Sequence, residues 1–165
     1  MRKSELSFLD LQGYDIAQSY DGLYSAAMFQ PRVIAGLGAV GIVVQSHWFF
    51  LALSAVLFWS AIVPTRNPFD TLSNLLIAYP RGLPVLPTAA APRRFAMGMA
   101  ATVALVIGGA LLGHALWMAW TFEAMLFGAA MAVVMTRSCA GANLYHALRR
   151  RGERAAAPST GMSKA

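Results

Sequence analysis

The chain has 165 residues, of which 58% are hydrophobic and only 12% are charged, and its formal net charge is +6. A soluble domain usually carries about 25% charged residues, so much of this surface is expected to face something other than water. Residues 33–63 and 95–136 contain a single charged residue, Glu123. Because each block exceeds the roughly 20 residues of one membrane-spanning helix, the sequence predicts an integral membrane protein and argues against a soluble domain.

The basic residues flank the apolar blocks. This placement favours contact with anionic lipid headgroups over nucleic-acid binding. The single cysteine excludes an internal disulfide and a cysteine-rich metal site. The first 15 residues lack the apolar core of a signal peptide, so we expect the chain to reach the membrane through its own helices.

Residues 1–30 are interpreted as a cytoplasmic N-terminal segment. Within it, the stretch 14–29 places five side chains on one helical face, with polar residues away from that face. The five are Ile16, Tyr20, Leu23, Tyr24 and Ala27. This pattern predicts a helix that lies in the membrane interface.

The first apolar block is interrupted only by "QSHW" at 45–48, which predicts two spans near 31–46 and 47–63. Pro31 suits a first helical turn and Pro64 ends the second span. Each span would be about 24 to 26 Å long, short against a hydrocarbon core of about 30 Å. A re-entrant hairpin is the alternative, but we favour full crossing because lipid-exposed turns are not tolerated at bilayer depth.

The following loop, 64–93, has six of the eight prolines and cannot form one long helix. The stretch "NPFDTLSNLL" within it is typical of a short amphipathic helix. Asn67 and Asp70 are the candidate N-terminal caps of that helix.

The second apolar block is divided by "GH" at 113–114 into predicted spans near 94–113 and 115–137, and a disordered tail is predicted for 153–165. Small residues recur every four positions in both spans, which favours close helix packing. These rows are Ala100, Ala104 and Gly108 in the first, and Gly128, Ala132 and Thr136 in the second.

All thirteen Lys and Arg residues lie before position 33, between 66 and 94, or from 137 onward. Four spans put these three segments on one side, which the positive-inside rule makes the cytoplasm. The sequence therefore predicts an all-α polytopic protein of the cell inner membrane. Its transmembrane domain, 31–152, would consist of four helices in two hairpins that pack as a four-helix bundle, with both termini cytoplasmic.

Three segments resemble a known family: "FQPRVIAG", "NPFDTLSNLL…LPVLPTAAAPRRFAMGMAA" and "SCAGANLY". Together, over about residues 28–150, they resemble the small bacterial membrane proteins grouped as domain of unknown function 4395. The resemblance supports the architecture and implies no activity. The residues that carry it most specifically are Pro92, Arg93, Arg94, Phe95, Cys139, Gly141 and Tyr145.

Relatives of this type often carry Cys-x-Gly-Cys-x-x-Tyr after the last span. Here Cys139, Gly141 and Tyr145 are kept, but Ala142 stands at the position of the second cysteine. A lone cysteine cannot cycle between dithiol and disulfide within one chain. The redox role that the resemblance would suggest is therefore weakened.

Cys139 is nevertheless the first candidate functional residue. Arg137 and Arg149 could favour its thiolate, because positive neighbours lower a cysteine pKa. The alternative, which we favour, is a small residue that closes helix packing.

Glu123, His47 and His114 are the remaining candidates. A carboxylate in an apolar span usually faces a cavity or a partner, and the nearest partner by sequence is the histidine in either predicted turn. The alternative is that Glu123 lies close enough to the turn to extend toward the lipid headgroups. The two histidines could also bind a metal or haem, but polar turn residues in an aromatic belt are the more common case. We therefore predict no metal site and no cofactor.

The sequence contains no nucleotide-binding loop, no zinc-ligand spacing and no nucleophile–base–acid set. We therefore expect a non-enzymatic membrane protein: an accessory or scaffold subunit, or a small-molecule-binding helical bundle. The alternatives are a thiol-redox or sulfur-metabolism component that acts through Cys139, and a small transporter subunit that uses Glu123. Expected partners are membrane lipids and a membrane protein or a second copy of the chain, but not nucleic acid.

Overall fold

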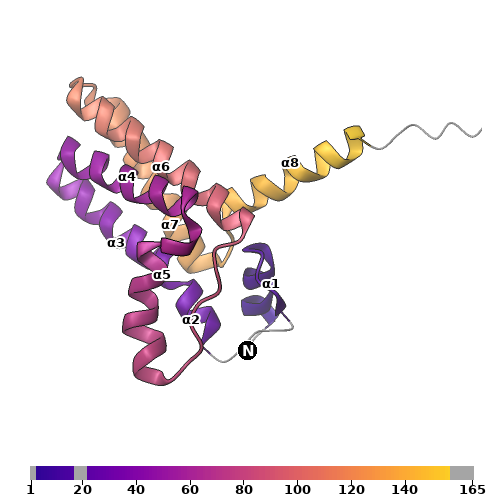
Figure 1. Ribbon diagram of the computed structural model, residues 1–165. Helices are drawn as coiled ribbons and strands as arrows, with labels where there is room; N and C mark the ends of the chain where they lie inside the picture. Colours follow the sequence, from indigo (N-terminus) through magenta and orange to yellow (C-terminus); the bar gives the residue numbers. More distant parts are fainter. Residues whose placement is uncertain (1–2, 17–21, 157–165) are drawn as a thin grey trace, which may run out of the picture.

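The computed structural model describes residues 3–16 and 22–156, and all regular secondary structure in these residues is helical. The all-α prediction is confirmed. Four long helices lie side by side (Figure 1): α3 (Phe29–Val44), α4 (His47–Ile62), α6 (Ala91–Leu112) and α7 (Leu116–Thr136). The segments α1 (Lys3–Leu11), α2 (Leu23–Ala27), α5 (Pro68–Ser73) and α8 (Ala140–Ala156) gather at one end of them, which we call the loop end.

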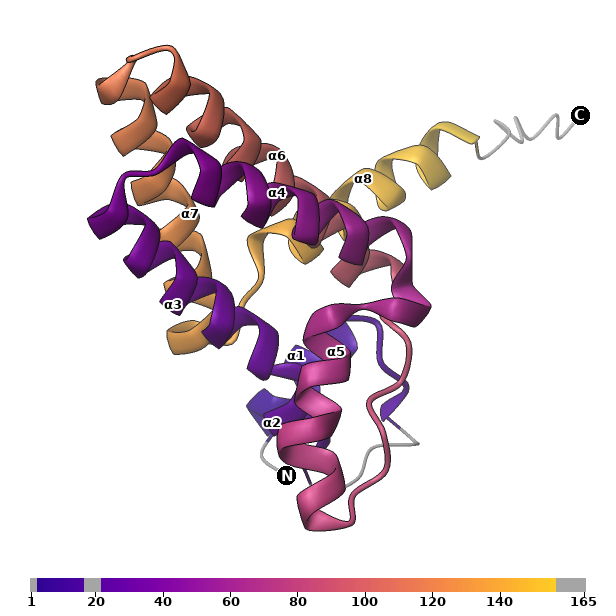
Figure 2. The same ribbon diagram turned by 60° about the vertical axis from the view of Figure 1, so that its left-hand side comes forward.

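The long helices pair between the two hairpins rather than only within them. Helix α4 packs along α6, α3 packs along α7, and α6 also contacts α7 (Figure 2). Small residues on α6 allow α4 to approach it closely. Ala101 and Ala104 are fully buried, the Ser54 hydroxyl donates to the Ala101 carbonyl at 2.9 Å, and a Cβ at Gly108 would meet Leu51 at 2.9 Å.

The predicted small-residue row of α6 therefore lies partly in the core, whereas the prediction for α7 was wrong. Gly128, Ala132 and Thr136 are all exposed. The buried face of α7 is offset from that row and contains Ala119, Glu123, Leu126, Ala130 and Val133. Larger side chains such as Leu126 and Val133 fill the contacts that the small residues were expected to make.

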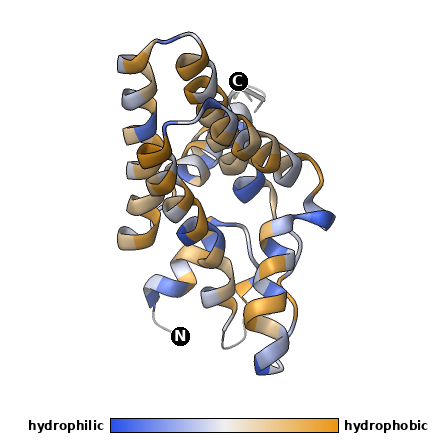
Figure 3. Ribbon diagram, turned by 90° about the vertical axis from the view of Figure 1, so that its left-hand side faces the viewer, coloured by the Kyte–Doolittle hydropathy of each residue, from blue (hydrophilic) through white to orange (hydrophobic). Residues whose placement is uncertain are grey.

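Three segments are long and apolar enough to cross a membrane: 23–44, α6 and α7. Helix α4 is equally apolar but has only 16 residues, about 24 Å at 1.5 Å per residue. Hydrophobic residues colour most of the length of these helices in Figure 3. Pro31 lies in the first turn of α3, as predicted, and the link between α3 and α4 is only Gln45 and Ser46.

The N-terminal prediction needs correction. Residues 14–29 do not form one helix: Tyr14 is not helical, and Gly22 has a φ of 105°, which a right-handed helix cannot contain. Of the predicted stretch, α2 and the start of α3 are helical, while residues 17–21, including Tyr20, lie outside the described residues. Helix α1, which the sequence analysis did not predict, buries Phe8 and Leu9 against α2 and the segment around Cys139.

The loop after α4 contains several short helices, as its prolines require. They are η2 (Pro64–Arg66), α5, η3 (Asn74–Ala78) and η4 (Tyr79–Arg81). Asn67 is the N-cap of α5, because its side chain accepts a hydrogen bond from the Phe69 amide at 3.0 Å. Asp70, the other candidate cap, instead pairs with Arg93.

Helix α8 extends away from the other helices at the loop end (Figure 1). It continues to Ala156, so the predicted disordered tail does not begin at 153. Glu153 accepts a hydrogen bond from the Arg149 guanidinium at 2.8 Å, an i,i+4 ion pair that supports the helix there. Residues 157–165 lie outside the described residues.

Candidate functional site

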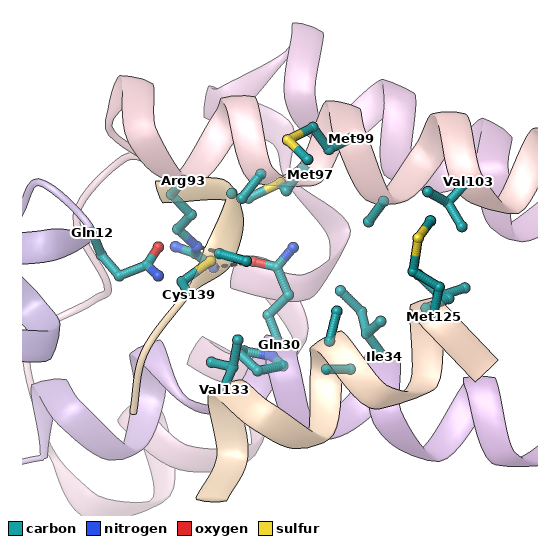
Figure 4. Close-up of a pocket in the computed structure, with 18 of the residues that line it drawn as sticks. Gln12, Gln30, Ile34, Arg93, Met97, Met99, Val103, Met125, Val133 and Cys139 are labelled. Carbon is teal, nitrogen blue, oxygen red and sulfur yellow. Dashed lines mark hydrogen bonds between the residues drawn. The ribbon is translucent and has the colours of Figure 1, made fainter. Parts of the chain in front are cut away.

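A pocket of about 290 Å³ lies between α3, α6 and α7 near the loop end (Figure 4). Most of its wall is apolar, with Ile34 from α3, Val103 from α6, and Met125 and Leu126 from α7. Its polar lining comes from Gln12, Gln30 and Arg93, and Figure 4 shows these three side chains close to Cys139, at the opposite end from Val103 and Met125. The pocket therefore has one polar and one apolar end.

Arg93 is the centre of the polar end. It is only 5% exposed, and its guanidinium is held by three segments that are far apart in the sequence. Nε and Nη2 donate to Gln30 Oε1 at 2.9 and 2.6 Å, Nη1 donates to the Tyr14 hydroxyl at 2.5 Å, and Nη2 also pairs with the Asp70 carboxylate. One side chain thus joins α3, α5, α6 and the turn after α1.

Asp70 supplies the counter-charge that this position needs. Arg93 lies in the first turn of α6, where the helix dipole disfavours a positive charge, whereas Asp70 lies in the first turn of α5, where a negative charge is favoured. Burial raises the pKa of the Asp70 carboxyl, while Arg93 and the Asn67 amide act in the opposite direction. The pair carries no net charge when both groups are ionised.

Gln12 contributes a further polar side chain to the pocket. It is 6% exposed, and within residues 3–16 and 22–156 its side-chain amide has no hydrogen-bond partner. Figure 4 shows the amide extending toward Arg93 and Cys139. Gly13 positions it: φ is 83°, and a Cβ there would lie 2.8 Å from Ala90 Cβ, so the turn sits directly against the start of α6.

Cys139 lies in the short link between α7 and α8, lines the pocket and is 9% exposed. The two arginines predicted to favour its thiolate are engaged elsewhere. Arg137 donates to the Ser4 hydroxyl and lies over the Tyr24 ring, 5.4 Å from its centroid, and Arg149 pairs with Glu153. The arginine that shares a pocket with Cys139 is Arg93.

Glu123 lies near the opposite end of the long helices, which we call the turn end because the links 45–46 and 113–115 lie there. It is 3% exposed, and its Oε2 accepts a hydrogen bond from Gln45 Nε2 at 2.7 Å. Among the described residues, Oε1 has no hydrogen-bond partner. The predicted histidine partner was therefore wrong: Gln45, which also accepts from Trp120 Nε1 at 3.3 Å, takes that place.

Neither predicted candidate histidine bonds to Glu123 in the described part of the chain. His47 begins α4 and stacks at an angle on Trp48, with ring centroids 5.0 Å apart, while His114 is exposed in the α6–α7 link. Within the part of the chain that the structure describes, no three His, Cys, Asp or Glu side chains are grouped so that they could hold a metal ion.

The residues that carried the family resemblance make the contacts between helices at the loop end. Besides the Arg93 network, Arg94 Nε donates to the Ala61 carbonyl at 2.8 Å, which ties α6 to the end of α4. The Phe95 and Tyr145 rings lie 5.9 Å apart and connect α6 to α8. A Cβ at Gly141 would lie 2.8 Å from Ala96 Cα, so only glycine allows α8 this close. Pro92 is buried beside Gly13.

Sequence reasoning identified Arg93 and Cys139 but missed Gln12, Gln30 and Tyr14 as members of the same site. These three lie in or near the N-terminal segment, more than 60 positions before Arg93, and no short-range pattern links them to it. Gly13 was the only local signal, since a glycine before Tyr14 can mark a turn.

Comparisons with known proteins agree with the resemblance seen in the sequence. Neither the curated proteins nor the solved structures contain a match to this chain. A family model does match, over residues 25–150, which covers the long helices, the loop between them and most of α8. The chain therefore belongs to the family described as a domain of unknown function (DUF4395).

Proposed function

We propose that this protein is a non-enzymatic component of the inner membrane that holds a small amphipathic molecule between its two helical hairpins. The observation that carries the proposal is the pocket, with its apolar wall and its polar end at Gln12, Gln30 and Arg93. Its volume of about 290 Å³ is close to the lower limit of roughly 300 Å³ for ligand pockets. A small ligand with an apolar body suits this space.

All four long helices cross the bilayer in this proposal, and the loop end faces the cytoplasm. The three long apolar segments support the crossing. The thirteen basic residues support the orientation, because they lie in segments away from the turn end. Helix α4 is short, but local thinning of the bilayer compensates for such a mismatch at modest cost.

Cysteine labelling in intact cells tests the topology. In a Cys139→Ser background, Gly113→Cys at the turn end should react with a membrane-impermeant maleimide, because Gly113 is exposed there. Ser159→Cys, beyond α8, should react only after the cells are opened. Labelling at position 159 in intact cells would contradict an even number of spans with cytoplasmic termini.

Extraction without detergent tests the binding role. The protein is taken from its host membrane in polymer-bounded lipid discs, and small molecules released from it by solvent are identified by mass spectrometry. A matched variant, Ala129→Trp, fills the pocket from α7, since Ala129 is an exposed lining residue. A molecule present with the wild-type protein and lost from this variant is the expected result; identical extracts contradict the proposal.

A thiol role for Cys139 is the second candidate, and its support is the position of that residue in the pocket wall. A single thiol would have to exchange with a partner's thiol or disulfide. Replacing Cys139 with serine should leave any host phenotype intact if the cysteine only packs. Loss of the phenotype at a normal protein level would favour the thiol role over simple binding.

A further inference from the structure

We infer that the pocket selects an uncharged molecule that has one carbonyl-like acceptor at the end of an apolar body, and that Gln12 binds this acceptor. The inference rests on the proposed binding function and names the ligand class. It begins from Gln12, which lines the polar end, is 6% exposed and makes no side-chain hydrogen bond within the described residues. Its polar atoms are not fully enclosed by the protein, so a ligand in the pocket can bond to them.

The charge balance of the polar end argues for an uncharged ligand. Arg93 is the charged residue of the lining, and its charge is already offset by Asp70. Its nitrogens are engaged by Gln30 and Tyr14 as well. An anionic headgroup would therefore leave one uncompensated negative charge in a buried site, and a cation would leave one positive charge. Either is unfavourable in a low-dielectric environment.

Gln12 supplies a hydrogen-bonding group whose donors and acceptor are all available. Its amide can donate two hydrogen bonds and accept others, and it extends into the polar end (Figure 4). Gln30 differs, because its carbonyl oxygen already accepts from Nε and Nη2 of Arg93, which holds the amide at the Arg93 side and leaves only its Nε2 to donate. The Gly13 turn, which lies against Ala90, fixes the backbone at Gln12 beside the start of α6.

The rest of the pocket determines where the apolar body lies. From Gln12 and Cys139 the lining continues along α6 and α7 to Val103 and Met125 (Figure 4). A ligand whose carbonyl contacts Gln12 therefore extends its chain toward the middle of these helices, the apolar part of the predicted spans. Methionine side chains adapt to irregular apolar shapes, which suits an aliphatic chain.

Cys139 allows a direct test, because it is the only cysteine and lines the polar end. The purified protein in lipid discs is treated with N-ethylmaleimide at a series of membrane mole fractions of 2-undecanone, decanoate or undecane. We expect the mole fraction that halves the labelling rate to be about fivefold lower for 2-undecanone than for undecane, the effect of roughly one hydrogen bond. Decanoate should be weaker than the ketone.

The thermal unfolding midpoint is the second readout and needs no thiol reaction. A compound that binds only the folded state raises the midpoint as its concentration increases. Gln12→Leu should abolish the preference for the ketone over undecane in both readouts. If leucine changes the labelling rate in the absence of ligand, Gln12→Met replaces it. Asn143→Leu, at an exposed amide on α8 that does not line the pocket, is the control and should keep the preference.

The outcomes separate the two proposals. If decanoate protects Cys139 more strongly than the ketone, or if Gln12→Leu and Gln12→Met retain the preference, the ligand class is wrong and the binding function stands. If none of the three compounds slows labelling or raises the midpoint, the pocket does not bind such molecules and both proposals fail. Protection by ketone and undecane to the same extent also overturns the role of Gln12.

Discussion

The two ends of the long helices treat a buried charge in different ways. At the loop end, Arg93 is 5% exposed and has a carboxylate, an amide and a hydroxyl as partners. At the turn end, Glu123 is 3% exposed, has only the Gln45 amide as a partner, and one carboxylate oxygen is left without a hydrogen bond among the described residues. The two side chains are buried to a similar extent, but only Arg93 has hydrogen-bond partners and a counter-charge that compensate for burial.

The two buried groups therefore have different effects on stability: Arg93 connects several segments, whereas Glu123 is incompletely hydrogen-bonded. A buried ion pair contributes little net stability compared with an apolar contact, but it is costly to break, and it fixes one arrangement of the segments that it joins. Arg93 has this role for α3, α5 and α6. Glu123 joins only α7 to the end of α3, through one hydrogen bond. Substitutions at the loop end should therefore be far more damaging than those at the turn end.

The largest effect should come from Asp70→Asn. It leaves the shape of the network intact but removes the counter-charge of Arg93, and breaking a buried pair in this way costs about 3 to 5 kcal/mol. Chemical unfolding in detergent measures the loss. Glu153→Gln is the control, because it breaks the exposed Arg149 pair on α8 and should change nothing measurable. Equal stability of both variants would show that Arg93 does not depend on Asp70.

Gly141→Ala should have the next largest effect. The added Cβ would lie 2.8 Å from the Ala96 Cα, a backbone atom that cannot move without shifting α6 or α8. Overpacking of this kind costs about 1 to 3 kcal/mol. Gly152→Ala is the control on the same helix, where a Cβ meets nothing within 4 Å. Alanine favours a helix more than glycine does, so Gly152→Ala should keep or raise the midpoint. An equal fall for both variants would show that the loss does not come from the α6–α8 contact.

The sequence predicted much of the fold and less of the site. Long apolar blocks and their polar breaks located the four long helices, because membrane length and helix rise leave few alternatives. The prediction for residues 14–29 failed because hydrophobic periodicity does not report the sign of φ: Gly22 has a positive φ, which ends a right-handed helix whatever the surrounding pattern. The positive φ at Gly13, just before this stretch, makes the turn that brings Tyr14 to Arg93 and Gln12 to the same pocket.

Tertiary partners were the part that no local pattern could supply. The sequence indicated that Glu123 needs a partner and suggested His47 or His114, which lie in the two turns. The structure selects Gln45, one position before Ser46, because it ends α3 in a left-handed conformation with its side chain directed to α7. Likewise, the small residues of α7 predicted a packed face, but α3 and α6 instead contact the face that contains Glu123 and Leu126.

The smallest expected change in stability comes from a substitution at the turn end, Glu123→Gln, and it is a gain rather than a loss. Glu123→Gln keeps an acceptor for the Gln45 amide but removes a negative charge that has no counter-charge within the described residues. Gln45 also keeps its bonds to the Ile42 carbonyl and Trp120. An unsatisfied buried group costs about 1 to 3 kcal/mol, and a neutral amide should recover about 1 kcal/mol of it.

Thermal unfolding in detergent should therefore show a higher midpoint for Glu123→Gln than for the wild-type protein. Thr121→Val, an exposed position two residues earlier on α7, controls for a general effect of reducing polarity. A lower midpoint for Glu123→Gln would mean that the free carboxylate oxygen bonds to a cation or water that stabilises the folded protein. The turn end would then be a second site, and Glu123 would resemble Arg93 in having its charge satisfied, by a group outside the chain.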